Sequence, residues 1–378
     1  MNEQEYQEAI QDVIYLAGCA VNGNIPEAGR VHAMNLENLY RAADRHSLTA
    51  ITAMALESAG VHDRAFTQAK GKAIRKVAMF DTEREIVLRE LEKAGIWYMP
   101  LKGSVLKTLY PKIGMRQMSD NDILYDVSRS ADVRAIMESL GFTTVIYVQN
   151  NFSHDQYNKE PVCNFEMHRA LFAPISGKAL YNYYLNVKER LIKDEGNAFG
   201  YHYTDEDFYI YITAHEYKHY SIGGTGLRSL LDAYVFLKRL DGKLNWNYIA
   251  GELDKLGIAD FERRNRDLAR RLFSGEALTP EDEAMLQYVV SSGVYGTRQN
   301  HVSNQIRKIG GGGKGKLRYL MNRIFLPMEC VESVYPFFYR HRVLLPILCF
   351  WRIGKALTTR RKRVCSELKI LSGYDDKE

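Results

Sequence analysis

The sequence predicts an α+β fold, in which a small mixed β-sheet lies between an N-terminal and a C-terminal helical region. Apolar residues recur at helical spacing over the first 95 residues and again from about residue 204. Between these regions the apolar runs are short and rich in aromatic or β-branched residues, as strands are. With 378 residues, 46% of them hydrophobic and 26% charged, the chain is long enough for several modules and is not disordered.

The first predicted module is an N-terminal helical region covering residues 1–95. Residues 34–57 carry apolar side chains at roughly helical spacing. Residues 73–94 repeat this pattern and are rich in Glu, Arg and Leu, which favour helices. Gly95 follows directly and is expected to end the second of these helices.

The second predicted module covers residues 96–175 and contains the sheet. The segment IWYMPL, residues 96–101, is typical of a short buried strand, and a helical segment follows the next three residues. A helix is also predicted over residues 130–140. Further strands are predicted at residues 122–125, 143–148 and 164–168.

Helical periodicity returns in the third predicted module, residues 176–309. Its strongest helices are predicted at residues 208–219 and 226–240, on either side of a Gly-rich turn. Four consecutive glycines at 310–313 predict a linker, because glycines hold regular structure only at a high entropic cost. The linker opens the last segment, a basic and aromatic tail over residues 310–378.

Several classes of protein are excluded by simple patterns. The five cysteines are scattered and form no CxxC pair, which argues against a disulfide framework and against a cysteine zinc site. The first residues are acidic, unlike the basic start of a signal peptide. The apolar run at 343–351 is too short to span a bilayer and contains Pro346. We therefore expect a cytoplasmic protein.

The charge is unevenly distributed along the chain. From His301 onward there are 16 basic and 6 acidic residues, while the remainder is mildly acidic. The simplest interpretation of this tail is a helical cap with a solvated basic face. A contact with an anionic membrane surface is the main alternative. Binding to nucleic acid is not favoured, because the tail has no signature of a known nucleic-acid-binding module.

The most informative stretch combines Lys102-Gly103-Ser104 with Asp120 and Asp122. Alternate strand residues point to one face, so the two carboxylates are predicted to project together and to need a cation between them. Oxygen ligands of this kind suit Mg²⁺ together with substrate phosphates. A Gly-Ser turn before a helix can present N–H groups to a phosphate. The simpler alternative is that the aspartates cap a turn and that the Gly-Ser pair only joins a strand to a helix.

These segments resemble a known family. The stretches LKGSVLKTLYP, RQMSDNDILY, RAIMESLGF and NFEMHRALF follow one another in the order seen in the uncharacterised nucleotidyltransferase family of the polymerase-β-like nucleotidyltransferase superfamily. The resemblance is most specific over residues 100–170 and extends weakly to His46 and to the C-terminal segment. Two departures are Asn121, where an apolar residue is commoner, and a longer gap after the Gly-Ser pair.

The resemblance implies a role for each matching residue. Asp120 and Asp122 would bind two divalent ions, with Mg²⁺ expected and Mn²⁺ as an alternative. Glu166 would be the third carboxylate, and it would help to deprotonate the acceptor hydroxyl. The residues that would contact or neutralise the triphosphate are Gly103, Ser104, Lys102 and Arg116.

Two of these residues have more than one interpretation. His168 shares a strand face with Glu166, so it contacts substrate or phosphate, or else holds the Glu166 side chain in place. Arg116 either neutralises phosphate or forms a structural ion pair with a nearby acid.

A competing motif lies in the C-terminal helical region. His215-Glu216-Tyr217-Lys218-His219 matches HExxH, in which two histidines of one helical face bind zinc and the glutamate activates water. The third ligand of the extended motif is absent, since Ile222 and Thr225 occupy the positions of its Gly and His. Asp232 or Glu252 would have to replace that ligand. The alternatives are structural roles for both histidines, or a place for His215 or His219 in the nucleotide cleft.

The sequence therefore predicts an enzyme that moves a nucleoside monophosphate from an NTP to a hydroxyl acceptor and releases pyrophosphate. ATP is the default nucleotide, and the sequence identifies neither the base preference nor the acceptor. The alternatives are a nucleotide-binding or regulatory module without turnover and, third, a zinc hydrolase.

Overall fold

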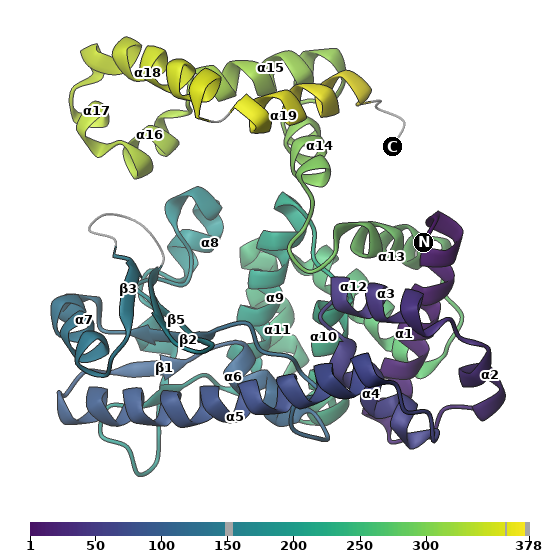
Figure 1. Ribbon diagram of the computed structural model, residues 1–378. Helices are drawn as coiled ribbons and strands as arrows, with labels where there is room; N and C mark the ends of the chain where they lie inside the picture. Colours follow the sequence, from purple (N-terminus) through teal and green to yellow (C-terminus); the bar gives the residue numbers. More distant parts are fainter. Residues whose placement is uncertain (148–153, 360, 375–378) are drawn as a thin grey trace.

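The computed structural model describes residues 1–147, 154–359 and 361–374, and it has the predicted α+β architecture. In the chain, a mixed sheet is preceded and followed by helical regions. In space, the last helices form a separate layer (Figure 1). The predicted strand at 143–148 is observed as β3, Thr143–Ile146, and its last predicted residue lies outside the described residues.

The sheet has five strands in the order β1-β2-β5-β4-β3. β2 and β5 are parallel, and the other neighbouring pairs are antiparallel. Three of the predicted strands are confirmed in place as β1, β2 and β5. The other four strands of the sheet are β1 Tyr98–Pro100, β2 Asn121–Tyr125, β4 His154–Lys159 and β5 Cys163–His168.

Strand β4 is not predicted from the sequence, because the segment HDQYNK lacks an apolar alternation. Its inward positions are nonetheless buried, and one of them is Asp155. The Asp155 carboxylate accepts hydrogen bonds from Tyr125 and Arg169, which compensate its removal from water. A polar residue therefore occupies a core position that the hydrophobic pattern assigns to apolar side chains.

Helices surround this sheet. The long helix α5 and the shorter α7 pack against each other beside it, and α6 follows β1 directly (Figure 1). The helix predicted at 34–57 is in fact two helices, α3 and α4, separated at His46–Leu48, where Ser47 has a φ of 55°. The first seven helices are α1 Glu3–Asn22, α2 Ala28–Ala33, α3 Leu36–Arg45, α4 Thr49–Ser58, α5 Arg64–Lys93, α6 Gly103–Leu106 and α7 Ser130–Ser139.

The region after the sheet contains a two-stranded hairpin and further helices. Both helices predicted at 208–219 and 226–240 are confirmed, as α9 and α10. The elements are α8 Lys178–Tyr183, β6 Ile192–Lys193, β7 Tyr201–His202, α9 Asp205–Ile222, α10 Leu227–Leu240, α11 Trp246–Leu256, α12 Ala259–Ser274 and α13 Pro280–Ser292.

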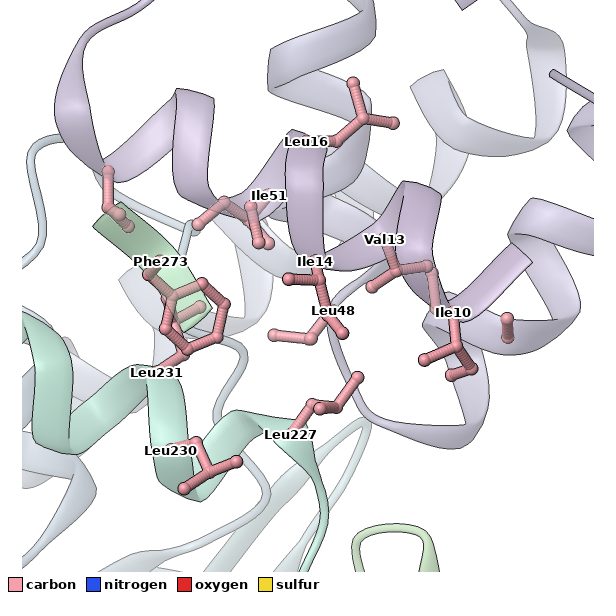
Figure 2. Packing of buried hydrophobic residues seen from close by; sticks show 14 of the residues in the cluster. Ile10, Val13, Ile14, Leu16, Leu48, Ile51, Leu227, Leu230, Leu231 and Phe273 are labelled. Carbon is pink, nitrogen blue, oxygen red and sulfur yellow. The ribbon is translucent and has the colours of Figure 1, made fainter. Parts of the chain in front are cut away.

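The largest hydrophobic core joins the two helical regions across the sequence. Side chains of α1 and α4 pack against side chains of α10 and α12 in one cluster (Figure 2). His46 connects the same parts: its Nδ1 accepts a hydrogen bond from the backbone N–H of Leu227 at 3.2 Å, and its Nε2 lies 3.1 Å from the Tyr6 hydroxyl. The N-terminal helices therefore hold α10, and with it one wall of the site described below.

The tail forms a helical layer that α14 connects to the body (Figure 1). The predicted Gly-rich linker is shorter than expected, because α15 already begins at Gly312. Gly315 brings α14 and α15 together, since a Cβ there would lie 2.9 Å from the Ile306 side chain. The tail helices are α14 Arg298–Lys308, α15 Gly312–Ile324, α16 Met328–Val334, α17 Pro336–Arg340, α18 Leu345–Thr358 and α19 Arg361–Gly373.

Among the described residues, no helix combines the length and the apolar character needed to cross a membrane.

Candidate active site

One face of the sheet gathers the acidic residues and imidazoles that the sequence singles out. Asp122 of β2 is in register with Glu166 of β5, and His168 of β5 is in register with His154 of β4. Residues paired across neighbouring strands share a face of the sheet, and so do alternate residues along one strand, so all four side chains lie on one side. Asp120 lies just before β2 and joins them there. This face borders a cavity of about 430 Å³ whose opposite wall is formed by α9 and α10.

Asp122 is buried between two nitrogen atoms. Lys102 Nζ donates a hydrogen bond to its Oδ1 at 2.8 Å, and His168 Nε2 lies 2.6 Å from the same oxygen. Burial alone would raise the pKa of Asp122, but Lys102 and His168 outweigh it and hold this pKa well below its usual range. Asp122 is therefore a carboxylate at neutral pH.

Asp120 is in the opposite situation. Burial, followed by repulsion from Asp122 and Glu166, raises the pKa of Asp120 to about 6. A divalent cation between these carboxylates would relieve that repulsion. Carboxylate oxygens are the ligands that a divalent ion such as Mg²⁺ prefers, and the binding of such an ion by Asp120, Asp122 and Glu166 stays a prediction.

Glu166 lies beside both imidazoles of the sheet face. Its Oε2 is 3.6 Å from His168 Nε2, and its Oε1 is 3.6 Å from His154 Nε2. Burial would raise the pKa of Glu166, but the adjacent His168 and His154 rings lower it overall. The proximity of His168 to both Asp122 and Glu166 agrees with a role in holding the acidic side chains in place.

The turn between β1 and α6 contains the predicted phosphate cradle. Lys102 has a φ of 45°, a region that residues other than glycine adopt rarely, and the turn places its Nζ on Asp122. Gly103 lines the cavity, and a Cβ there would lie 2.6 Å from Arg116 Nη1. The Ser104 hydroxyl is buried and donates to the Leu101 carbonyl at 2.7 Å. Ser104 thus has a structural partner, and its predicted contact with the triphosphate stays a prediction.

Arg116 forms a buried ion pair with Asp232, which is the structural role predicted as the alternative to phosphate binding. Its Nε and Nη2 donate to the two carboxylate oxygens of Asp232 at 2.8 and 2.9 Å. The Tyr110 hydroxyl donates to the same carboxylate at 2.8 Å. Arg116 still borders the cavity, but two of its N–H groups are used in the bidentate contact with Asp232.

The two histidines of the HExxH motif line the same cavity from α9. His215 Nε2 and His219 Nε2 are 3.3 Å apart. The Glu216 carboxylate accepts a hydrogen bond from Asn265 at 3.1 Å, and burial raises the pKa of Glu216 to about 8. The substitute ligands weighed for zinc, Asp232 and Glu252, are held in ion pairs.

Among the described residues, the group of three that could hold a metal ion is His154, Glu166 and His168, and it does not include the HExxH histidines. The geometry therefore places His215 and His219 at the cleft without the ligand set of a zinc hydrolase.

Sequence reasoning missed three cavity residues. His154 lies on the unpredicted strand β4, so no pattern indicated its position. Lys218 lies inside the HExxH segment, and Arg228 follows the Gly-rich turn before α10; a basic residue after such a turn is a weak signal for anion binding. Burial and neighbouring cations lower the pKa of both Lys218 and Arg228. Within the described chain, neither has a carboxylate at ion-pair distance.

The α+β protein thus has carboxylates on a sheet face opposite half-buried cations on a helical wall. The comparison with protein families gives the particular assignment. A family model described as an uncharacterised nucleotidyltransferase matches residues 32–274, which is more than half of the chain, so the chain belongs to this family. The assignment supports a transferase that uses an NTP. A comparison with curated proteins gives no match, and one with solved structures gives none either.

Proposed function

We propose that the protein transfers a nucleoside monophosphate from an NTP to a hydroxyl acceptor, with divalent metal ions held by Asp120, Asp122 and Glu166. The observation that carries this proposal is the convergence of these carboxylates on one sheet face. Burial, followed by repulsion from the neighbouring carboxylates, raises the pKa of Asp120 to about 6, and a bound cation would oppose this repulsion. Bound ions would supply Lewis-acid stabilisation of the oxygens on the reacting phosphorus.

The proposed reaction is an in-line displacement at the α-phosphorus. The acceptor oxygen forms a bond to this phosphorus, the bond to the β-phosphate oxygen breaks, and pyrophosphate leaves. Glu166 is a carboxylate at neutral pH and would take the acceptor proton. Lys218 and Arg228 would bind the phosphate oxygens, because each is a cation on the cavity wall without a carboxylate partner among the described residues.

The test is calorimetric titration of each NTP, with ATP first, in the presence and absence of Mg²⁺. Wild type is expected to bind a nucleotide only with the metal, and the Asp120→Asn/Asp122→Asn double variant is expected to lose that binding. Pyrophosphate release with candidate hydroxyl acceptors then distinguishes an enzyme from the alternative, a regulatory module that binds nucleotide without turnover. Metal-independent binding that survives in the double variant would contradict the proposed site.

We also propose that the tail contacts an anionic membrane surface. The helix α18 exposes Ile347, Phe350, Trp351 and Leu357, which fall on one stripe at helical spacing. Phe350 is 75% exposed, and Lys355 Nζ lies 4.8 Å from the centre of the Trp351 ring. Exposed aromatic residues beside cations suit an interfacial helix, which needs both apolar burial and attraction to anionic lipid.

Co-sedimentation with vesicles tests this contact. Binding is expected with vesicles that contain phosphatidylglycerol, and it should weaken with added salt and in neutral phosphatidylcholine vesicles. Phe350→Asp should reduce binding, while Ile25→Asp, at an exposed apolar residue of the body, should not. Self-association of the protein without vesicle binding would instead make α18 an interface between two copies.

A further inference from the structure

The imidazoles next to Glu166 raise a question about the metal itself. His154 and His168 approach the Glu166 carboxylate from two adjacent strands, with ring centres 5.1 Å apart. One ligand atom from each of these three residues can be chosen so that all lie within 4.8 Å of one another. His168 Nε2 is also 2.6 Å from Asp122 Oδ1, which places the Asp122 carboxylate next to this group.

His168 directs one ring nitrogen at the carboxylates. Its Nε2 lies 2.6 Å from Asp122 Oδ1 and 3.6 Å from Glu166 Oε2, while its buried Nδ1 has no hydrogen-bond partner among the described residues. Imidazole nitrogens are common ligands of metal ions, so a cation held beside Glu166 would be bound by this Nε2 in place of its hydrogen bond to Asp122.

We propose that Glu166, His154 and His168 form a mixed nitrogen and oxygen site, beside Asp122, that prefers a first-row transition ion to Mg²⁺. This inference rests on the proposed function, because it concerns one of its two metal positions. Mg²⁺ favours oxygen ligands, whereas imidazole suits transition ions, and two histidines with a carboxylate are a common set for them. Mn²⁺ binds most weakly in the divalent series, so a preference for Mn²⁺ over Mg²⁺ is the most demanding test.

The first experiment measures binding of Mn²⁺ alone to chelator-treated, nucleotide-free protein by electron paramagnetic resonance. Wild type is expected to bind one equivalent of Mn²⁺, and a 100-fold excess of Mg²⁺ should not displace it. His154→Ala and His154→Gln should weaken Mn²⁺ binding by about 10-fold or more, the scale seen even for residues that only support a ligand. His62→Ala removes an exposed histidine far from the sheet and is the matched control. Melting temperatures establish that each variant is folded.

The inference would be overturned if equimolar Mg²⁺ displaced half or more of the bound Mn²⁺. It would also be overturned if both folded His154 variants bound Mn²⁺ as tightly as wild type. Pyrophosphate release in Mg²⁺ alone and in Mn²⁺ alone separates this outcome from the proposed function. Transfer in Mg²⁺ by a protein without Mn²⁺ preference would keep the function and remove the transition-ion site. If Mn²⁺ binding depends on His154 but no nucleotide transfer is detected, the transition-ion site stands and the proposed function is rejected.

Discussion

Two walls face each other across the candidate active site, and each contributes a pair of histidines. On the sheet wall, His154 and His168 come from adjacent strands and lie beside Glu166. On the helical wall, His215 and His219 are one turn apart, and among the described residues no third metal-binding side chain completes a ligand set with them. Spacing within one strand or helix brings two side chains together, but their chemistry depends on the residues that a neighbouring element adds.

The largest effect is expected from the acidic residues of the sheet wall. Asp122→Asn should lower the rate of pyrophosphate release by on the order of 10³-fold, because a bound metal ion contributes several kcal/mol to stabilisation of the transition state. Asp132→Asn, at an exposed helical position, should leave the rate unchanged. A steady-state assay with equal nucleotide occupancy checks this. A fully active Asp122→Asn protein would refute the role of the sheet wall.

The second prediction compares the two catalytic glutamates proposed by the competing motifs. Glu166→Gln should reduce transfer by roughly 10²-fold, the usual scale for a lost general base. Glu216→Gln should retain transfer activity, since the Glu216 carboxyl group is bonded to Asn265 rather than placed among metal ligands. The same preparations should be assayed for bound zinc. Stoichiometric zinc that is lost on His219→Ala would reverse the comparison and favour the hydrolase.

The third prediction contrasts paired and unpaired cations at the cavity. Arg116→Gln leaves the buried Asp232 carboxylate without its bidentate partner and should lower the free energy of unfolding by about 3–5 kcal/mol. Arg228→Gln removes a cation without a described carboxylate partner and should not destabilise the fold, but it should weaken NTP binding by about 10-fold. Denaturant titration and calorimetry measure the two effects. A strongly destabilised Arg228→Gln protein would show that this arginine is structural.

The last prediction is a pH dependence of stability that originates on the helical wall. Burial, followed by repulsion from Asp232, raises the pKa of Glu216 from 4.5 to about 8. The folded state therefore keeps this proton while the unfolded state releases it, so the Glu216 contribution to stability falls as pH rises from 4.5 towards 8. Glu216→Gln should flatten the melting temperature over this range. Parallel curves for both proteins would contradict the raised pKa.

Local sequence patterns were sufficient to predict which side chains lie together on each of the two strands β2 and β5 of the sheet wall. Alternation placed Asp120 with Asp122, and Glu166 with His168, because both pairs are two residues apart in extended segments. Helical spacing likewise placed His215 beside His219. The four glycines at 310–313 predict a longer linker than the structure has, because Gly312 lies in the first turn of α15.

The sequence by itself determined the α+β class, the main helices and the acidic residues of the family motif, because these depend on periodicity and on residues close together in the chain. Only the tertiary structure decided that β5 pairs in parallel with β2 and places Glu166 next to Asp122. It also decided that Arg116 pairs with Asp232 and that polar β4 brings His154 to the site. These contacts join distant segments, and their register is set by the packing of whole elements rather than by any local pattern.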